Sequence, residues 1–238
     1  YAVRPAGPEV VAAGRLAVVR AALITAVFAV LTVEGLGAIG RLSLAPVAGA
    51  WLVFLVAVLA AAALRHRRAP WRPEFRPRQW WREASLAERL LAGTVGGLLL
   101  LELLVALVAE PNNFDSQTYH LPKVEHWVAQ QSLELWPTAI HRQVTIPPGA
   151  EYLLLHLRLL TGGDRLHHLI QWGAGLGAVL LVSRITAQLG GGRRAQLLSA
   201  FVLACTPMVV LQATSTQTDL VVAAWVGVVA TLVLDGLR

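Results

Sequence analysis

The stretch RLLAGTVGGLLLLELLVALVAEPNNFD, residues 89–115, decides the fold of this 238-residue chain. It begins with an apolar run of membrane length, since a helix needs about 20 apolar residues to cross the hydrocarbon layer. It ends in the turn-forming residues Pro-Asn-Asn-Phe, followed at once by Asp115. The run therefore predicts a transmembrane helix, and the turn places a carboxylate at the membrane boundary.

Further apolar stretches of similar length flank this one, so the sequence predicts an all-α, polytopic transmembrane helix bundle of about six spans. We expect the spans at roughly residues 16–39, 43–64, 89–109, 166–189, 195–212 and 219–237, with Pro207 bending the fifth. Charged residues make up only 14% of the chain and apolar residues 56%, which is too little charge to cover a soluble domain. A single cysteine, Cys205, excludes an internal disulfide framework.

The basic residues are unevenly distributed between the two sides of this bundle. Eight arginines lie between the second and third spans, at positions 65, 67, 68, 72, 76, 78, 82 and 89. Only Arg41, Lys123, Arg142, Arg158 and Arg165 fall on the other side. By the positive-inside rule the arginine-rich side is cytoplasmic, so residues 110–165 form a long extracytoplasmic loop of a multi-pass plasma-membrane protein. The net charge of +6 then reflects topology, and we expect lipid bilayer and no nucleic acid as partner.

Two short helices are expected within this loop. The first begins at Pro122 and is amphipathic, which is typical of a helix that lies on the membrane surface. Its shared face is predicted to consist of Val124, Trp127, Val128 and Gln131, with Leu135 continuing the stripe, while Lys123, Glu125 and Gln130 point elsewhere. The second follows Pro147-Pro148, ends at Gly162-Gly163 and is too short to span.

Two carboxylates, Asp115 and Asp219, are placed by this topology on the same outer side. Asp219 begins the sixth span after the polar residues 214–218. Taken singly, Asp219 fits a helix N-cap and Asp115 a solvated turn. Taken together at one site, they fit a general base with a second carboxylate, or a divalent metal site.

A series of motifs follows residue 110. It reads NNFDSQTYHLPKVEHW, then IPPGAEYLLL, then GGDR, then a proline in a later span and the loop ATSTQTD ending in Asp219. In this order, from residue 110 to 237, the motifs resemble the GT-C superfamily of membrane glycosyltransferases. More narrowly, they resemble the bacterial branch related to protein O-mannosyltransferases and the lipid A aminoarabinose transferase. The adjacent Asp-Glu pair of the mannosyltransferases is absent here, because Ser116 follows Asp115.

The resemblance implies a polyprenyl-phosphate-dependent glycosyltransferase that acts at the extracytoplasmic face. Such enzymes transfer a sugar from the lipid carrier to an acceptor hydroxyl of a glycan, lipid or protein, usually with inversion. The family's loop aspartate corresponds to Asp115, and the second outer aspartate of the lipid A branch corresponds to Asp219. The expected groups for substrate or phosphate binding are Lys123, Arg142, His120 and Tyr119, and Asp115 with Asp219 would hold a divalent metal ion if one is used.

The resemblance also divides the chain. Residues 1–88 form a two-span addition with a basic cytoplasmic loop, and residues 89–238 form the N-terminal part of a catalytic membrane module. Relatives of this kind are longer, so the present chain is expected to be an incomplete enzyme. The alternatives are a non-catalytic membrane scaffold and a transporter subunit, of which the latter needs broken helices and ionisable groups within the spans.

Overall fold

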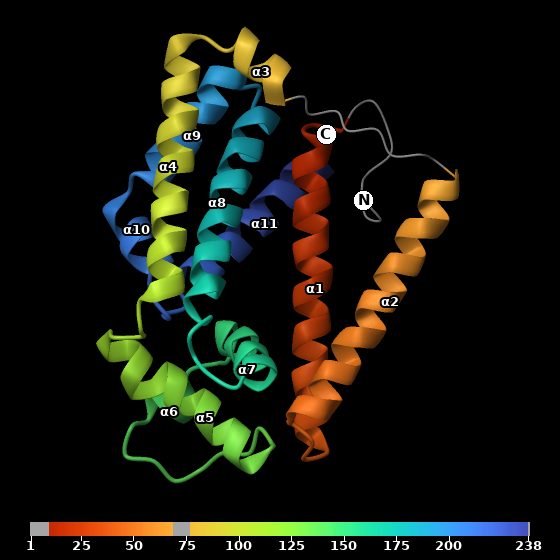
Figure 1. Ribbon diagram of the computed structural model, residues 1–238, viewed down its shortest axis with the longest axis vertical. Coiled ribbons are helices and arrows are strands. Elements are labelled where there is room, and N and C mark those ends of the chain that lie inside the picture. Colours follow the sequence, from red (N-terminus) through yellow and green to blue (C-terminus); the bar gives the residue numbers. More distant parts are fainter. Residues whose placement is uncertain (1–9, 69–76, 238) are drawn as a thin grey trace.

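The computed structural model describes residues 10–68 and 77–237, and every regular element in these two ranges is a helix (Figure 1). Five helices are long and apolar enough to cross a membrane: α1 (Ala13–Ala38), α2 (Leu44–Arg68), α4 (Leu86–Val108), α8 (His168–Gln188) and α11 (Asp219–Gly236). A bent pair, α9 (Arg193–Ala204) and α10 (Pro207–Ala213), supplies a sixth span if it crosses as one unit. The predicted all-α, membrane-spanning bundle is confirmed.

The bend between α9 and α10 measures 68° and lies where the sequence predicts it. Pro207 is in the first turn of α10, and Thr206 before it adopts an extended conformation. A proline disfavours helical geometry in the residue that precedes it and donates no backbone hydrogen bond, so one continuous helix cannot form through this point. The bend ends α9 early, and α10 leads into the polar loop of residues 214–218.

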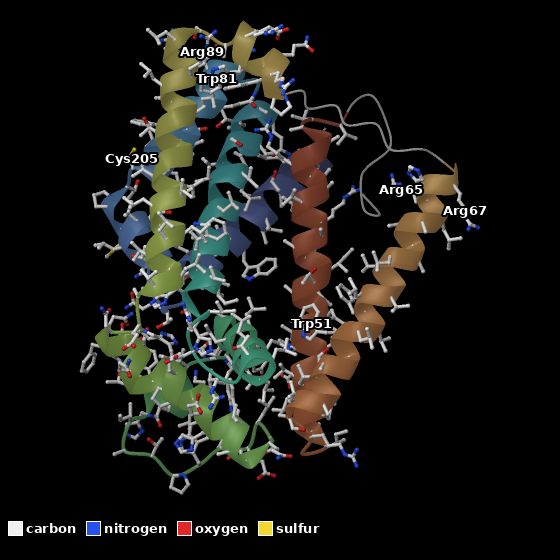
Figure 2. All side chains as sticks on the ribbon, viewed as in Figure 1. Trp51, Arg65, Arg67, Trp81, Arg89 and Cys205 are labelled. Carbon is white, nitrogen blue, oxygen red and sulfur yellow. The ribbon has the colours of Figure 1, made fainter. Side chains whose placement is uncertain are left out.

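The arginine-rich segments gather at one end of the bundle, where Figure 2 shows Arg65, Arg67, Trp81 and Arg89. The short helix α3 (Pro77–Glu83) lies at this end, and Ser85 and Glu88 form a capping box that starts α4. Of the predicted basic loop, Arg72 and Arg76 fall outside the described residues. The clustering agrees with the charge asymmetry read from the sequence.

A layer of short helices covers the opposite end of the bundle (Figure 1). It consists of the π-helix η1 (Ser116–His120), α5 (Leu121–Gln130), α6 (Arg142–Thr145) and α7 (Ala150–Thr161). Both predicted loop helices are therefore present. Two details of the first one differ from the sequence prediction. Lys123, expected off the apolar face, is nonetheless buried. The chain turns at Gln131 with φ +53°, so Gln131 ends the helix and Leu135 lies beyond it, 76% exposed.

The α1–α2 hairpin shares its core with this layer. Val33, Leu42 and Val47 of the hairpin pack with Val124 and Leu154 of the layer in one buried cluster. Polar contacts reinforce the junction between the hairpin and α7. The Tyr152 hydroxyl donates a hydrogen bond to Glu34 Oε1 at 2.5 Å, and Trp51 Nε1 donates to His156 Nδ1 at 3.1 Å. Residues predicted to be a separate addition are thus packed directly against the loop helices.

Candidate functional site

Asp115 stands at the N-terminal end of a π-helix just beyond α4. The π-helix η1 is continuous with α5, so residues 116–130 leave the end of the span as one bent helical unit. Asn113 Oδ1 accepts the backbone N–H of Ser116 at 2.8 Å and stabilises this start. π-helical turns are rare and frequently occur at functional sites. The π-helical turn of η1, which is wider than an α-helical turn, sets the positions of Asp115, Tyr119 and His120 relative to one another.

The Asp115 carboxylate meets two groups that are distant in sequence. Its Oδ2 accepts a hydrogen bond from Gln217 Nε2 at 3.2 Å, and its Oδ1 lies 3.7 Å from Arg142 Nη1. Gln217 belongs to the loop between α10 and α11, and Arg142 begins α6. The Asp115 side chain is 33% exposed and that of Arg142 is 62% exposed, so both groups remain accessible. The carboxylate is held by the protein yet open to a ligand.

The loop of residues 214–218 is attached firmly to η1. Thr216 Oγ1 donates a hydrogen bond of 2.6 Å to Ser116 Oγ, and neither residue is exposed. The same loop ends at Asp219, the first residue of α11, which is exposed. Thr218 occupies the N-cap position, so Asp219 is not the capping residue itself. These contacts bring the loop that ends at Asp219 beside the start of η1, which follows Asp115.

Tyr119 experiences the negative charge of both Asp115 and Asp219. Burial raises the pKa of its hydroxyl, and the negative charges of Asp115 and Asp219 raise it further, while Arg142 lowers it. The Arg142 guanidinium carbon lies 5.6 Å from the centre of the Tyr119 ring, a cation–π contact. We refer to Asp115, Tyr119, Arg142, Gln217 and Asp219 as the Asp115 cluster. It contains four of the six residues that the sequence predicts for the site.

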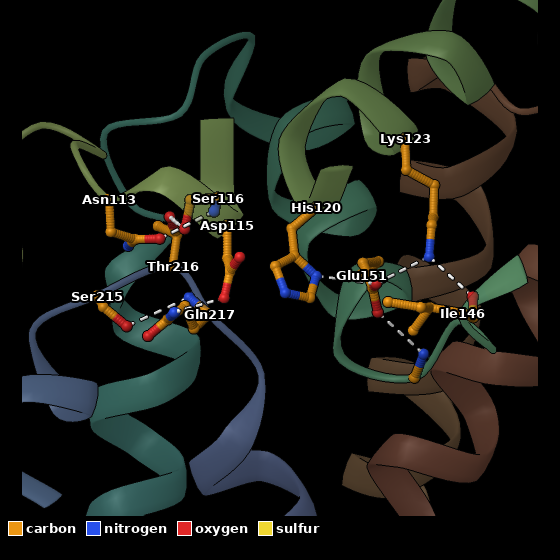
Figure 3. Close-up of polar contacts among 11 residues, drawn as sticks. Asn113, Asp115, Ser116, His120, Lys123, Ile146, Glu151, Ser215, Thr216 and Gln217 are labelled. Atoms are coloured by element: carbon orange, nitrogen blue, oxygen red, sulfur yellow. Dashed lines mark hydrogen bonds and ion pairs between the residues drawn. The ribbon is translucent and has the colours of Figure 1, made fainter. Parts of the chain in front are cut away.

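The other two predicted residues, His120 and Lys123, belong to a neighbouring buried network centred on Glu151 (Figure 3). Glu151 Oε1 lies 3.0 Å from His120 Nδ1 and 3.0 Å from Lys123 Nζ. Lys123 Nζ also donates to the carbonyl oxygen of Ile146 at 2.9 Å. Because the Lys123 side chain is only 2% exposed and its ammonium is engaged by protein groups, it does not face the Asp115 cluster as a phosphate ligand would.

Glu151 is the site residue that sequence reasoning missed. It lies in the first turn of α7, where an acidic residue is ordinarily explained by the helix dipole. Its side chain is 2% exposed. Burial raises its pKa, but the hydrogen bond from His120, the charge of Lys123 and the Gly149 N–H outweigh burial and bring the pKa to about 2. In the sequence Glu151 is a single acidic residue after a proline-containing turn. That pattern does not predict that His120 and Lys123 contact its carboxylate.

A divalent metal ion has few protein ligands available at this site. In residues 10–68 and 77–237, no group of three or more His, Cys, Asp or Glu side chains is arranged to hold a metal. Asp115 already contacts Arg142 and Gln217. Mg²⁺ can bind through one or two carboxylates when a phosphate supplies further oxygens, whereas a cage made by the protein alone does not fit. The arrangement is therefore better suited to binding an anion through Arg142 than to holding a resident metal.

The fold and the site define a polytopic α-helical membrane protein with an acid–base and cationic cluster at the end of the bundle opposite its arginine-rich segments. Comparison with protein-family models, with curated proteins and with solved structures finds no match to this chain. The function is therefore argued from the site itself.

Proposed function

We propose that this chain belongs to an integral plasma-membrane glycosyltransferase of the GT-C type. It would transfer a sugar from a polyprenyl-phosphate donor to an acceptor hydroxyl of a glycan, lipid or protein at the extracytoplasmic face. The observation that carries the proposal is the contact of Asp115 with Gln217 and Arg142 at the end of α4. It unites a carboxylate, a neutral hydrogen-bonding group and an accessible cation just beyond the end of a candidate span, which supports binding of a lipid phosphate there.

Each group in the Asp115 cluster has a step to perform in such a transfer. The acceptor hydroxyl loses its proton to the Asp115 carboxylate as its oxygen bonds to the anomeric carbon. The bond from that carbon to the phosphate oxygen breaks, and the electron pair leaves with the lipid phosphate. Arg142 stabilises the charge that develops there, because its guanidinium can donate two hydrogen bonds to one phosphate. Asp219 and Tyr119 contribute to the electrostatic potential at the Asp115 carboxylate. Because the hydroxyl attacks from the side opposite the leaving group, the anomeric centre is inverted.

Substitution of Asp115 by asparagine tests the proposal. The protein in nanodiscs is supplied with a panel of undecaprenyl-phosphate hexoses and pentoses and with envelope glycans and lipids as acceptors, and release of undecaprenyl phosphate is measured. We expect Asp115→Asn to lower turnover by a factor of about 10²–10⁴, the usual contribution of a general base. Glu134→Gln is the matched control, since Glu134 is an exposed carboxylate of the same segment. Undiminished turnover of Asp115→Asn would remove the base assignment.

The orientation is tested separately by labelling. After Cys205→Ala removes the native thiol, Leu135→Cys reports on the layer of short helices and Arg194→Cys on the arginine-rich end, since both positions are exposed. A membrane-impermeant maleimide should label only Leu135→Cys on intact cells. Labelling of Arg194→Cys alone would invert the topology and exclude transfer at the outer face.

A transporter subunit is the second candidate, and two features of the spans favour it. The α9–α10 span is broken, and Arg184 lies fully buried within α8, paired with Asp235 of α11. Broken helices and ionisable groups within spans are typical of transporters. The two functions separate experimentally, because a transporter would depend on Arg184 and Asp235 for solute uptake and would tolerate Asp115→Asn.

A further inference from the structure

The Glu151 network fixes the chemical state of its carboxylate. Oε1 lies 3.0 Å from both His120 Nδ1 and Lys123 Nζ. Oε2 accepts a hydrogen bond from the backbone N–H of Gly149 at 3.1 Å. A buried carboxylate with an ammonium partner and two further hydrogen bonds is held in its ionised form. An ionised carboxylate can only accept hydrogen bonds. Every partner of Glu151 must therefore be a donor.

This requirement determines the tautomer of His120. The ring atom at 3.0 Å from Glu151 is Nδ1, so Nδ1 must carry a hydrogen. Nδ1 keeps that hydrogen whether the imidazole is neutral or charged, which leaves Nε2 as the only ring atom that can gain or lose a proton. Nε2 has no hydrogen-bond partner within residues 10–68 and 77–237. The unused nitrogen is thus the reactive one.

The His120 ring lies beside Tyr119, a member of the Asp115 cluster. In Figure 3 the His120 ring lies between Asp115 and Glu151, with its Nδ1 directed to Glu151. The neighbouring Tyr119 ring lies 4.2 Å from the His120 ring, centre to centre, and the Tyr119 hydroxyl is within the field of Asp115. The His120 side chain is 5% exposed, so bulk solvent does not replace Glu151 as its partner.

We propose that His120 is a proton-relay residue of the Asp115 cluster, and that Glu151 is the positioning residue that keeps its Nε2 available. The inference rests on the proposed function. After the acceptor proton has passed to Asp115, a water molecule carries it to the lone pair of Nε2, which forms imidazolium and restores the Asp115 carboxylate. The imidazolium then releases the same proton to water outside the membrane, so no other reactant is needed. Lys123 keeps Glu151 ionised through the cycle.

The positioning role of Glu151 is tested without any substrate. In protein labelled with ¹⁵N-histidine, the signals of His120 are assigned by their loss in His120→Asn. We expect Nδ1 to be fully protonated in the wild type. In the double variant Lys123→Met with Glu151→Gln, which leaves no unpaired buried charge, the amide can donate or accept, so a mixture of tautomers is expected. Full Nδ1 protonation in the double variant would overturn the role of Glu151.

The relay itself is tested by turnover. The side-chain N–H of asparagine in His120→Asn replaces Nδ1–H toward Glu151 but nothing replaces Nε2, so a purely structural role is preserved and a relay is lost. We expect kcat to fall at least about tenfold, with the KM for the undecaprenyl-phosphate sugar within about twofold. Imidazole in the buffer should raise kcat of His120→Gly but not of His120→Asn, in which the site is filled.

The outcomes separate this inference from the proposal on which it rests. Wild-type kcat in His120→Asn, together with an inactive Asp115→Asn, would refute the relay and leave the glycosyltransferase standing. Undiminished turnover in Asp115→Asn would refute both. Loss of kcat in His120→Asn with imidazole rescue of His120→Gly would establish the relay.

Discussion

Removing the negative partner of Arg184 should destabilise the bundle more than any loss of a surface ion pair. Arg184 is fully buried in α8, and its Nη2 donates to both carboxylate oxygens of Asp235, at 2.8 Å each. Its Nη1 donates to the hydroxyl of Thr231. In Asp235→Asn the shape of the side chain remains but the charge is lost. Arg184 is then an uncompensated charge inside the membrane-spanning region.

The magnitude follows from the burial of the two partners. Breaking a buried ion pair by removing one member costs about 3–5 kcal/mol. The Asp235 side chain is 29% exposed, so water can reach the end of α11 and partly replace it. The lower end of the range applies, about 3 kcal/mol. In the double variant Arg184→Met with Asp235→Leu no charge remains, and about the wild-type stability is expected.

Steric trapping in bicelles measures the free energy of unfolding for this comparison. The matched control is Glu125→Gln, which breaks the exposed pair of Arg158 with Glu125, whose Nε–Oε1 distance is 2.6 Å. Exposed pairs contribute less than about 1 kcal/mol, so this variant should change little. Equal losses in Asp235→Asn and Glu125→Gln, or no recovery in the Arg184–Asp235 double variant, would refute the argument from burial.

Three further predictions concern the layer of short helices and the loops. The pKa of Glu151 is lowered to about 2. The ionised Glu151 carboxylate therefore stabilises the fold fully above its unfolded pKa near 4.5, and this contribution is lost as the pH falls through 2. A series of acid unfolding measurements should show the free energy of unfolding fall by about 3 kcal/mol, a loss that the Lys123→Met/Glu151→Gln variant lacks. Thr216→Val leaves the buried Ser116 hydroxyl without its 2.6 Å partner and should cost about 1–3 kcal/mol of unfolding free energy, whereas adding Ser116→Ala should restore most of it. A Cβ at Gly191 would lie 2.8 Å from the Thr186 carbonyl oxygen, so Gly191→Ala should lower the melting temperature by an amount equivalent to about 1–3 kcal/mol, and Gly192→Ala, which meets nothing within 4 Å, should melt nearer to the wild type.

The spans could be predicted because their signal is local. Twenty apolar residues in a row have few alternatives to a membrane helix, and a proline within such a run interrupts it wherever the helix packs. The predicted break at Pro207 and the start of α7 after Pro148 are confirmed for this reason. The end of α5 was not predictable in the same way. Gln131 adopts φ +53° without being a glycine, so the expected stripe toward Leu135 does not form.

The buried network at the site could not be derived from helical periodicity. Lys123 lies off the apolar stripe of α5, and periodicity alone assigns such a residue to solvent. Its burial depends on Glu151, which a different helix supplies 28 positions later. The placement of Asp115 and Asp219 at one end of the bundle could be predicted, because alternating spans bring the end of α4 and the start of α11 to the same side. The individual partners of Asp115 depend on packing that only the folded chain contains.

The shared core between the α1–α2 hairpin and α7 makes the thickness of the bilayer a variable for this protein. Of the described membrane helices α2 is the least covered by the rest of the chain, with 6% of its apolar window buried, so it is the span most exposed to a change in the surrounding bilayer. The hairpin is joined to α7 through Tyr152 and His156, and Glu151 immediately precedes Tyr152. A thinner membrane that tilts the hairpin is therefore expected to shift α7 and, through Glu151, the position of the His120 ring.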